Sequence, residues 1–195
     1  MVPSDVPLAV AELETYRLGC LYSRKPFRVF FGIRTCPYLL EMANVLAAAK
    51  AKHKAELGFE FSFGMISPLR FAEDDLACAS LTARDGWPTH CYSFVLIGAS
   101  SPASMAGALT LSNAERLACL ALMWAWSQDG QRVAEEVDDP SIIDPRTMAT
   151  SFGHPNIFTL SVAHSQLCRF YGLAAAGGLG LSTSNERRWS GSAMA

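Results

Sequence analysis

Two pairs of polar residues are the first candidates for chemistry in this sequence. Asp144 and Arg146 fall at a loop-to-helix junction after a candidate strand, where barrel enzymes place catalytic groups. Asn113 and Glu115 lie in a long apolar helix, where a buried amide or carboxylate needs a partner. The first pair is therefore the catalytic candidate and the second pair the substrate-binding candidate. Each has an alternative: Asp144 caps a helix and pairs with Arg146, which residue physics alone favours, and Asn113 and Glu115 brace neighbouring loops.

Aromatic residues near these positions form the next candidate group. Tyr92, together with Trp87, Trp124 and Trp126, could supply aromatic faces for a cationic ligand. Tyr92 is accordingly a substrate-binding candidate. Core packing is the more common role of such residues and stays the alternative.

Metal and cofactor motifs are not found in the sequence. None of the four histidines is spaced from another histidine or a carboxylate as metal ligands are, and there is no phosphate-binding loop or nucleophile elbow. The glycines at 177–180 do not fit a dinucleotide fingerprint. We therefore expect no metal and no directly bound cofactor.

Composition narrows the class of protein and its surroundings. The chain has 195 residues, 50% of them hydrophobic, and a net charge of -2. This charge gives no sign of the basic surface that binds nucleic acid. No apolar run is long enough to span a membrane, and the N-terminus lacks a basic signal region. The six cysteines are scattered, which predicts buried, reduced thiols and a cytoplasmic location.

Helical and strand patterns alternate along the chain. Apolar spacing, proline positions and glycine ends predict helices over 10–22, 36–56, 73–84, 101–128 and 154–171. Apolar or alternating runs predict strands over 27–31, 59–66, 91–97, 131–137 and 173–182. In the long helix, Ser101 is the expected cap, and Met105, Leu109, Asn113, Leu117, Leu120 and Trp124 form the expected buried stripe.

This alternation predicts an α/β fold with a parallel sheet. A complete eight-stranded barrel needs about 250 residues, so the chain is either a smaller open sheet or part of a barrel. Two open sheet edges would favour homo-oligomers.

Four ordered blocks give the sequence a resemblance to a known family. They are SPLRF from Ser67, GASSPASMAGALTLSNAERLA from Gly98, DPRTMATSFGHP from Asp144, and QLCRFYGL with the following glycines from Gln166. Together they resemble the trimethylamine methyltransferase (MttB-like) family. The resemblance covers about residues 13–183.

The resemblance implies a (βα)₈ TIM-type barrel and a methyltransferase function. Such enzymes transfer a methyl group from trimethylamine or a betaine-like quaternary amine to cob(I)alamin. The implied partners are a corrinoid protein, which carries the cobalamin, and a small methylated amine. The barrel would place the amine at its carboxyl-end mouth, where aromatic faces and carboxylates suit a cation.

Departures from the family pattern define the expected domain limits. His154-Pro155-Asn156 lacks the family's usual glutamate, and the strand predicted over 131–137 is charged. The match ends near Ser184, so we expect a partial TIM-barrel domain over 10–184 and an unmatched, frayed tail over 185–195. Truncation or a shifted frame would explain this ending. The alternatives to an active enzyme are a non-catalytic remnant that binds a corrinoid protein or a barrel partner, and an unrelated small α/β enzyme.

Overall fold

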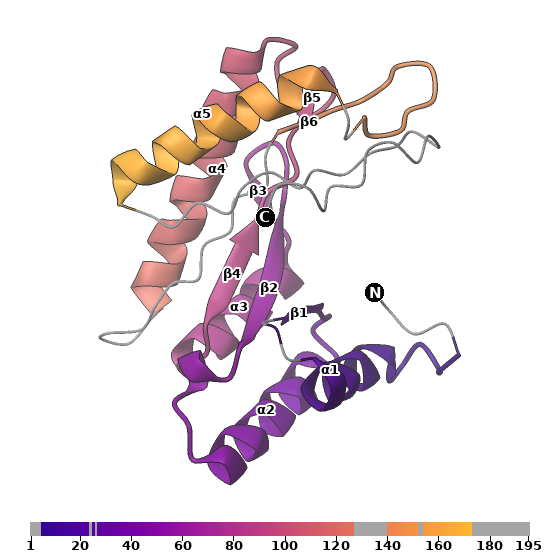
Figure 1. Cartoon of the computed structure of the whole chain (residues 1–195), viewed down its shortest axis with the longest axis vertical. Helices are drawn as coiled ribbons and strands as arrows, with labels where there is room; N and C mark the ends of the chain where they lie inside the picture. The colour runs from indigo at the N-terminus through magenta and orange to yellow at the C-terminus, as the bar shows by residue number, and fades with distance from the viewer. Residues whose placement is uncertain (1–4, 24, 26, 127–139, 152–153, 173–195) are drawn as a thin grey trace. The chain divides into compact units, whose positions relative to one another are not determined.

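Helices and short strands alternate through the chain, which confirms the predicted α/β class (Figure 1). The structure is a computed structural model and describes residues 5–23, 25, 27–126, 140–151 and 154–172. Its elements are α1 Ala11–Tyr22, β1 Phe27–Phe30, α2 Cys36–Lys50, η1 Lys54–Glu56, β2 Phe59–Ile66, β3 Arg70–Phe71, α3 Glu73–Arg84, β4 Thr89–Tyr92, β5 Leu96–Ile97, α4 Met105–Trp126, β6 Ser141–Ile142 and α5 Pro155–Tyr171.

Parallel strand pairs connected by helices define the local topology. Strands β1 and β2 pair in parallel with Phe27 opposite Phe59, and α2 connects them. The same sheet includes β3 and β4, which both pair with β2. Strands β5 and β6 form a separate parallel pair connected through α4. Both parallel connections are thus βαβ crossovers, as the alternation predicted.

The chain divides into two compact units. Unit 1 consists of Met1–Gly64, Phe71–Cys91 and Cys119–Ala134, and unit 2 of Met65–Arg70, Tyr92–Ala118 and Glu135–Ala195. Strand β2 and helix α4 each pass from one unit into the other.

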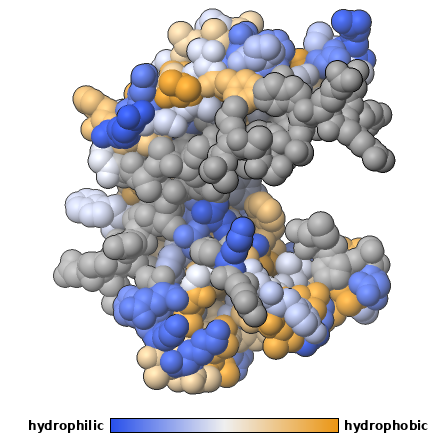
Figure 2. Space-filling model, viewed as in Figure 1, coloured by the Kyte–Doolittle hydropathy of each residue, from blue (hydrophilic) through white to orange (hydrophobic). Residues whose placement is uncertain are grey.

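An aromatic cluster forms the core of unit 1. The Phe61 ring packs edge-to-face against Phe31, Phe59 and Trp87, at centroid distances of 5.2, 4.8 and 5.7 Å. Leu39 of α2 and Cys78 of α3 are buried in the same cluster. Such offset aromatic packing adds to the free energy gained by burying the rings. Apolar and charged side chains intermingle on the visible surface over α1 and α2 (Figure 2).

Helix α4 lies against α5 within unit 2. The Arg116 guanidinium of α4 donates to the Cys168 Sγ of α5 at 3.0 Å, and Asn113 Nδ2 donates to the Tyr171 hydroxyl at 3.1 Å. Leu160, His164 and Cys168 are the buried residues of α5. No helix among the described residues is long and apolar enough to cross a membrane.

Several predicted element ends are wrong, each for a local reason. Helix α2 ends at Lys50 rather than Glu56, because Ala51 has the left-handed φ of 49° that ends a helix. The strand predicted over 91–97 is instead the two short strands β4 and β5. Helix α4 begins at Met105, and Ser104 rather than Ser101 accepts the first-turn amide of Gly107. The strands predicted over 131–137 and 173–182, and the tail over 185–195, lie outside the described residues.

The buried face of α4 is also not the predicted stripe. Met105, Leu117 and Trp124 of that stripe are exposed, Trp124 by 80%. The buried face of α4 consists instead of Met123 and of small or polar residues. These are Ala108, Ser112, Glu115, Arg116 and Cys119. Polar groups at these positions need partners, and those partners define the candidate site.

Candidate functional site

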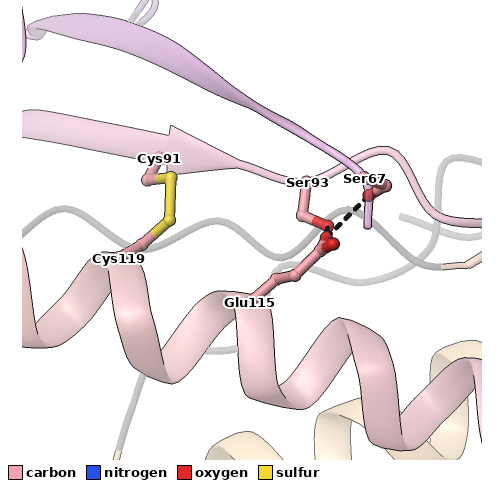
Figure 3. The surroundings of a disulfide bond; sticks show 5 residues. All are labelled: Ser67, Cys91, Ser93, Glu115 and Cys119. Atoms are coloured by element: carbon pink, nitrogen blue, oxygen red, sulfur yellow. Dashed lines mark hydrogen bonds between the residues drawn. A yellow bond between two sulfur atoms is a disulfide. The ribbon is translucent and has the colours of Figure 1, made fainter. Parts of the chain in front are cut away.

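Glu115 is the centre of the hydrogen-bonded cluster that holds the loop after β2. Its side chain is 0% exposed and accepts hydrogen bonds from the Ser67 hydroxyl at 2.7 Å and the Leu69 amide at 2.8 Å. The Ser93 hydroxyl donates to the same carboxylate (Figure 3). Donors of this kind compensate the cost of burying a carboxylate. These contacts fit the loop-bracing alternative for Glu115, and its contact with substrate stays a prediction.

The partners of Glu115 come from the carboxyl ends of two strands. Ser67 and Leu69 directly follow β2, and Ser93 directly follows β4. In parallel α/β folds, ligand-binding and catalytic groups gather at this end of the strands. Tyr92, the predicted aromatic ligand for a cation, is the last residue of β4 and is half-buried. The structure thus places Tyr92 next to a segment that Glu115 holds.

A disulfide joins β4 to α4 beside this cluster. Cys119 lies one helical turn after Glu115 and is bonded to Cys91 of β4 (Figure 3). The prediction of six reduced cysteines is therefore wrong at these two positions, because the fold brings together two residues that are far apart in sequence. Cys20, Cys36, Cys78 and Cys168 are free thiols.

Two of the free thiols influence each other's pKa in unit 1. Interaction between the Cys36 and Cys78 thiols lowers the pKa of Cys36 and, together with burial, raises that of Cys78. Both side chains are buried in the aromatic core, so they act there as small apolar groups.

Asn113 belongs to a different cluster from Glu115. It is half-buried, accepts a hydrogen bond from the Arg116 guanidinium, and donates to Tyr171. The same guanidinium lies over the Tyr171 ring at 5.6 Å. The two predicted substrate-binding residues of α4 thus have separate sets of partners. Nothing in the local sequence pattern indicates that Arg116 is buried.

Asp144 and Arg146 contact each other in the loop after β6, but not as predicted. Asp144 Oδ1 accepts the backbone amide of Arg146 at 2.9 Å, and residues 145–147 form a turn rather than a helix. Asp144 therefore closes an Asx-type turn, and the prediction that it caps a helix is wrong. The side chain of Arg146 is exposed.

Two tryptophans of the predicted aromatic group pack in the core of unit 1. Trp87 is fully buried in the core of unit 1, and Trp126 packs against a second buried cluster of that unit. Core packing, the alternative for these tryptophans, is confirmed for both. Tyr92 remains the aromatic candidate of the group.

Polar residues of unit 1 line a shallow cavity of about 490 Å³. Asn44 links two of its neighbours, since its side chain donates to Asp85 at 2.7 Å and accepts from Trp87 Nε1 at 3.0 Å. Lys54 pairs with Asp85 at 3.0 Å. Burial raises the pKa of Asp85, but hydrogen bonds from Asn44 and Lys54 outweigh it, and the net pKa is below the usual value. None of the sequence-predicted site residues lines this cavity.

Metal chemistry has no structural support in the part of the chain that the structure describes. There, no group of three or more His, Cys, Asp or Glu side chains is arranged to hold an ion.

These observations define the protein first by class, as an α/β protein with polar side chains at the carboxyl ends of its strands. The sequence model of the family described as trimethylamine methyltransferase (MTTB) matches residues 1–188. The chain belongs to the trimethylamine methyltransferase family.

Two curated relatives agree with this assignment. The chain is 28% identical over 183 residues to a glycine betaine methyltransferase of Desulfitobacterium hafniense (strain Y51), covering 93% of this chain and 38% of the relative. It is 24% identical over 183 residues to the trimethylamine methyltransferase MttB of Desulfitobacterium hafniense (strain DSM 10664 / DCB-2), covering 91% of this chain and 36% of that relative. The chain therefore spans less than two-fifths of the length of either relative.

Proposed function

We propose that this chain acts in methyl transfer from trimethylamine or a betaine-like quaternary amine to the cob(I)alamin of a corrinoid protein. The family match over residues 1–188 is the observation that carries the proposal. The parallel β1–α2–β2 and β5–α4–β6 units support a further inference, that the chain is part of a (βα)₈ barrel. The corrinoid is a substrate presented by the partner protein, so this chain needs no bound cofactor of its own.

In the proposed reaction, the chain positions the amine. The C–N bond to one methyl group breaks, nitrogen keeps the electron pair, and the methyl carbon bonds to cobalt, whose electron pair forms the new bond. A positively charged amine is the better leaving group, and an aromatic face and carboxylates stabilise it while bound. We assign the aromatic face to Tyr92 and the catalytic carboxylate to Asp144, with Arg146 beside it as the second catalytic residue and Asn113 as a further polar contact.

The exposed turn at Asp144 makes this assignment testable without unfolding the chain. Asp144→Asn keeps the side-chain oxygen that accepts the Arg146 amide but removes the negative charge. Asp74→Asn, which removes an exposed carboxylate from the first turn of α3, is the matched control. Each variant is mixed with reduced cobalamin and either trimethylamine or glycine betaine, and the visible spectrum is followed.

We expect Asp144→Asn to slow methyl transfer at subsaturating amine by about 10- to 100-fold, through a higher KM, since a charged contact to the bound cationic amine is typically worth about 1.5–3 kcal/mol. Asp74→Asn should react as the wild type does. Equal rates for all three proteins would refute the role of Asp144. No spectral change with the wild-type chain and a competent corrinoid protein would refute its activity.

A non-catalytic binding role is the second candidate. The chain spans 38% of the length of the glycine betaine methyltransferase to which it is similar. Retention of a corrinoid protein on the immobilised chain, without turnover of either amine, would support this role. Homo-oligomers formed through the edge of β1, and a cytoplasmic location without nucleic-acid partners, complete the proposal.

A further inference from the structure

The loop Ser67–Arg70, whose last residue also begins β3, is exposed at its tip but is held by a buried carboxylate. The Leu69 side chain is 60% exposed, and Pro68 and Arg70 are exposed beside it. The Glu115 carboxylate that binds this loop is 0% exposed. Exposed loops ordinarily satisfy their polar groups with water, so this loop does not need Glu115 for solvation.

Burying Glu115 is costly compared with an apolar side chain of the same size. Replacing buried charged groups by apolar residues is often neutral or stabilising, so a buried carboxylate is weak support for a stabilising role. Its three hydrogen-bond donors come from two segments that are separate in sequence, Ser67 with Leu69, and Ser93. The arrangement therefore fixes geometry more than it adds stability.

The backbone of the loop is also in a conformation that needs support. Leu69 has a φ of 52°, in the left-handed region that is unfavourable for a residue with a side chain. Its amide donates to Glu115 Oε1 at 2.8 Å, which holds Leu69 in this conformation. Strained residues of this kind concentrate at binding and catalytic sites, where the surrounding structure maintains them.

We propose that Glu115 is a positioning residue of the methyl-transfer site. It fixes the loop Ser67–Arg70 at the carboxyl end of β2, so that the exposed Leu69 and Arg70 keep one orientation toward the methylated amine. In this role Glu115 acts through the loop, in place of the direct contact with substrate that the sequence predicts. This inference rests on the proposed function.

Three substitutions distinguish the effect of Glu115 on the geometry of the loop from the effects of its charge and of the stability of the chain. Glu115→Ala removes every contact to the loop. Glu115→Gln keeps an oxygen for the Leu69 amide and a donor for one serine hydroxyl, so it should restore most of the geometry. Thr110→Ala is the matched control on α4, because its hydroxyl donates at 2.8 Å to the Ala106 carbonyl of the same helix.

The first measurement is hydrogen exchange of the Leu69 amide in the full chain. We expect Glu115→Ala to speed this exchange by about 10-fold or more, beyond any change in global unfolding, because the amide loses its acceptor. Glu115→Gln should stay within about 3-fold of the wild type, and Thr110→Ala should not change it. Unchanged exchange in Glu115→Ala would overturn the proposal.

The second measurement is the rate of methyl transfer from glycine betaine to reduced cobalamin, with trimethylamine as the comparison. We expect Glu115→Ala to lower kcat by about 10- to 100-fold while KM changes much less, since a displaced positioning element lowers the fraction of well-oriented substrate. Glu115→Gln should recover most of kcat. A merely structural brace would lower the melting temperature but leave kcat unchanged in the folded protein, and this result would overturn the proposal.

The two measurements keep the failure of this inference distinct from the failure of the proposed function. If the wild-type chain transfers no methyl group from either amine, the proposed function fails, and the positioning role in methyl transfer falls with it. If the wild type reacts but the loop of Glu115→Ala becomes mobile without loss of kcat, only the positioning role fails.

Discussion

Reduction of the disulfide between Cys91 and Cys119 should destabilise the protein by an amount that its position predicts. The bond closes a loop with a sequence separation of 28 residues. Closing a loop of this length lowers the entropy of the unfolded chain by an amount worth about 3.5 kcal/mol at 25 °C. For a chain of this size, that free energy corresponds to a melting temperature lower by about 7–14 °C after reduction.

Thiol titration and thermal unfolding together test this prediction. In denaturant without reductant, four thiols should react, because Cys20, Cys36, Cys78 and Cys168 are free, and full reduction should expose all six. The double variant Cys91→Ser with Cys119→Ser should melt near the reduced wild type and should not respond to reductant. Six reactive thiols before reduction, or equal melting temperatures with and without reductant, would refute the cross-link and the reasoning from loop length.

The remaining predictions concern stability in each unit. Folding lowers the pKa of Asp85. Its ionised carboxylate therefore stabilises the folded state fully above the unfolded pKa of about 4, and this stabilisation is lost as the pH falls through the lower folded pKa. In urea unfolding measured from pH 6 to pH 2, Asp85→Asn should therefore make the loss of stability at acid pH less steep. Phe61→Ala should cost about 3–5 kcal/mol in urea unfolding, whereas Tyr38→Ala at a 61% exposed position should change stability by less than about 1 kcal/mol. Arg116→Lys should cost about 1–2 kcal/mol, because an ammonium cannot reproduce the two-pronged contact to α5 and Asn113, and an unchanged midpoint would contradict this.

Elements specified by local patterns were predicted well from the sequence. Strand β2 and helix α3 have the predicted bounds, because alternating phenylalanines define β2 and three acidic residues define the first turn of α3. The end of α5 was also predicted, since Gly172 adopts the left-handed φ of 73° expected at a helix end. At these positions, neighbouring residues alone determine the backbone.

The contacts of the candidate site depend on the tertiary fold and were not predictable in the same way. Glu115 was identified as a buried carboxylate in the sequence, but its donors Ser67 and Ser93 lie 48 and 22 residues away. The residues around Ser67 predict a loop, but nothing in them predicts a contact with Glu115. No periodicity relates Cys91 to Cys119, and the cysteines carry no spacing that distinguishes a bonded pair from free thiols.

The error over the buried face of α4 has a physical cause that also explains how the site is built. Apolar periodicity predicts the face that a helix would bury if burial of apolar area made the largest contribution to the free energy of packing. In this helix, the apolar Leu117 and Trp124 are exposed, and Glu115 and Arg116 are buried instead. A buried polar residue must have partners in specific directions, so each one determines which segment lies against the helix and at what register. Helix α4 therefore orders its neighbours through directional bonds, and changes at Glu115 should alter the position of the loop after β2 more than they alter the stability of the chain.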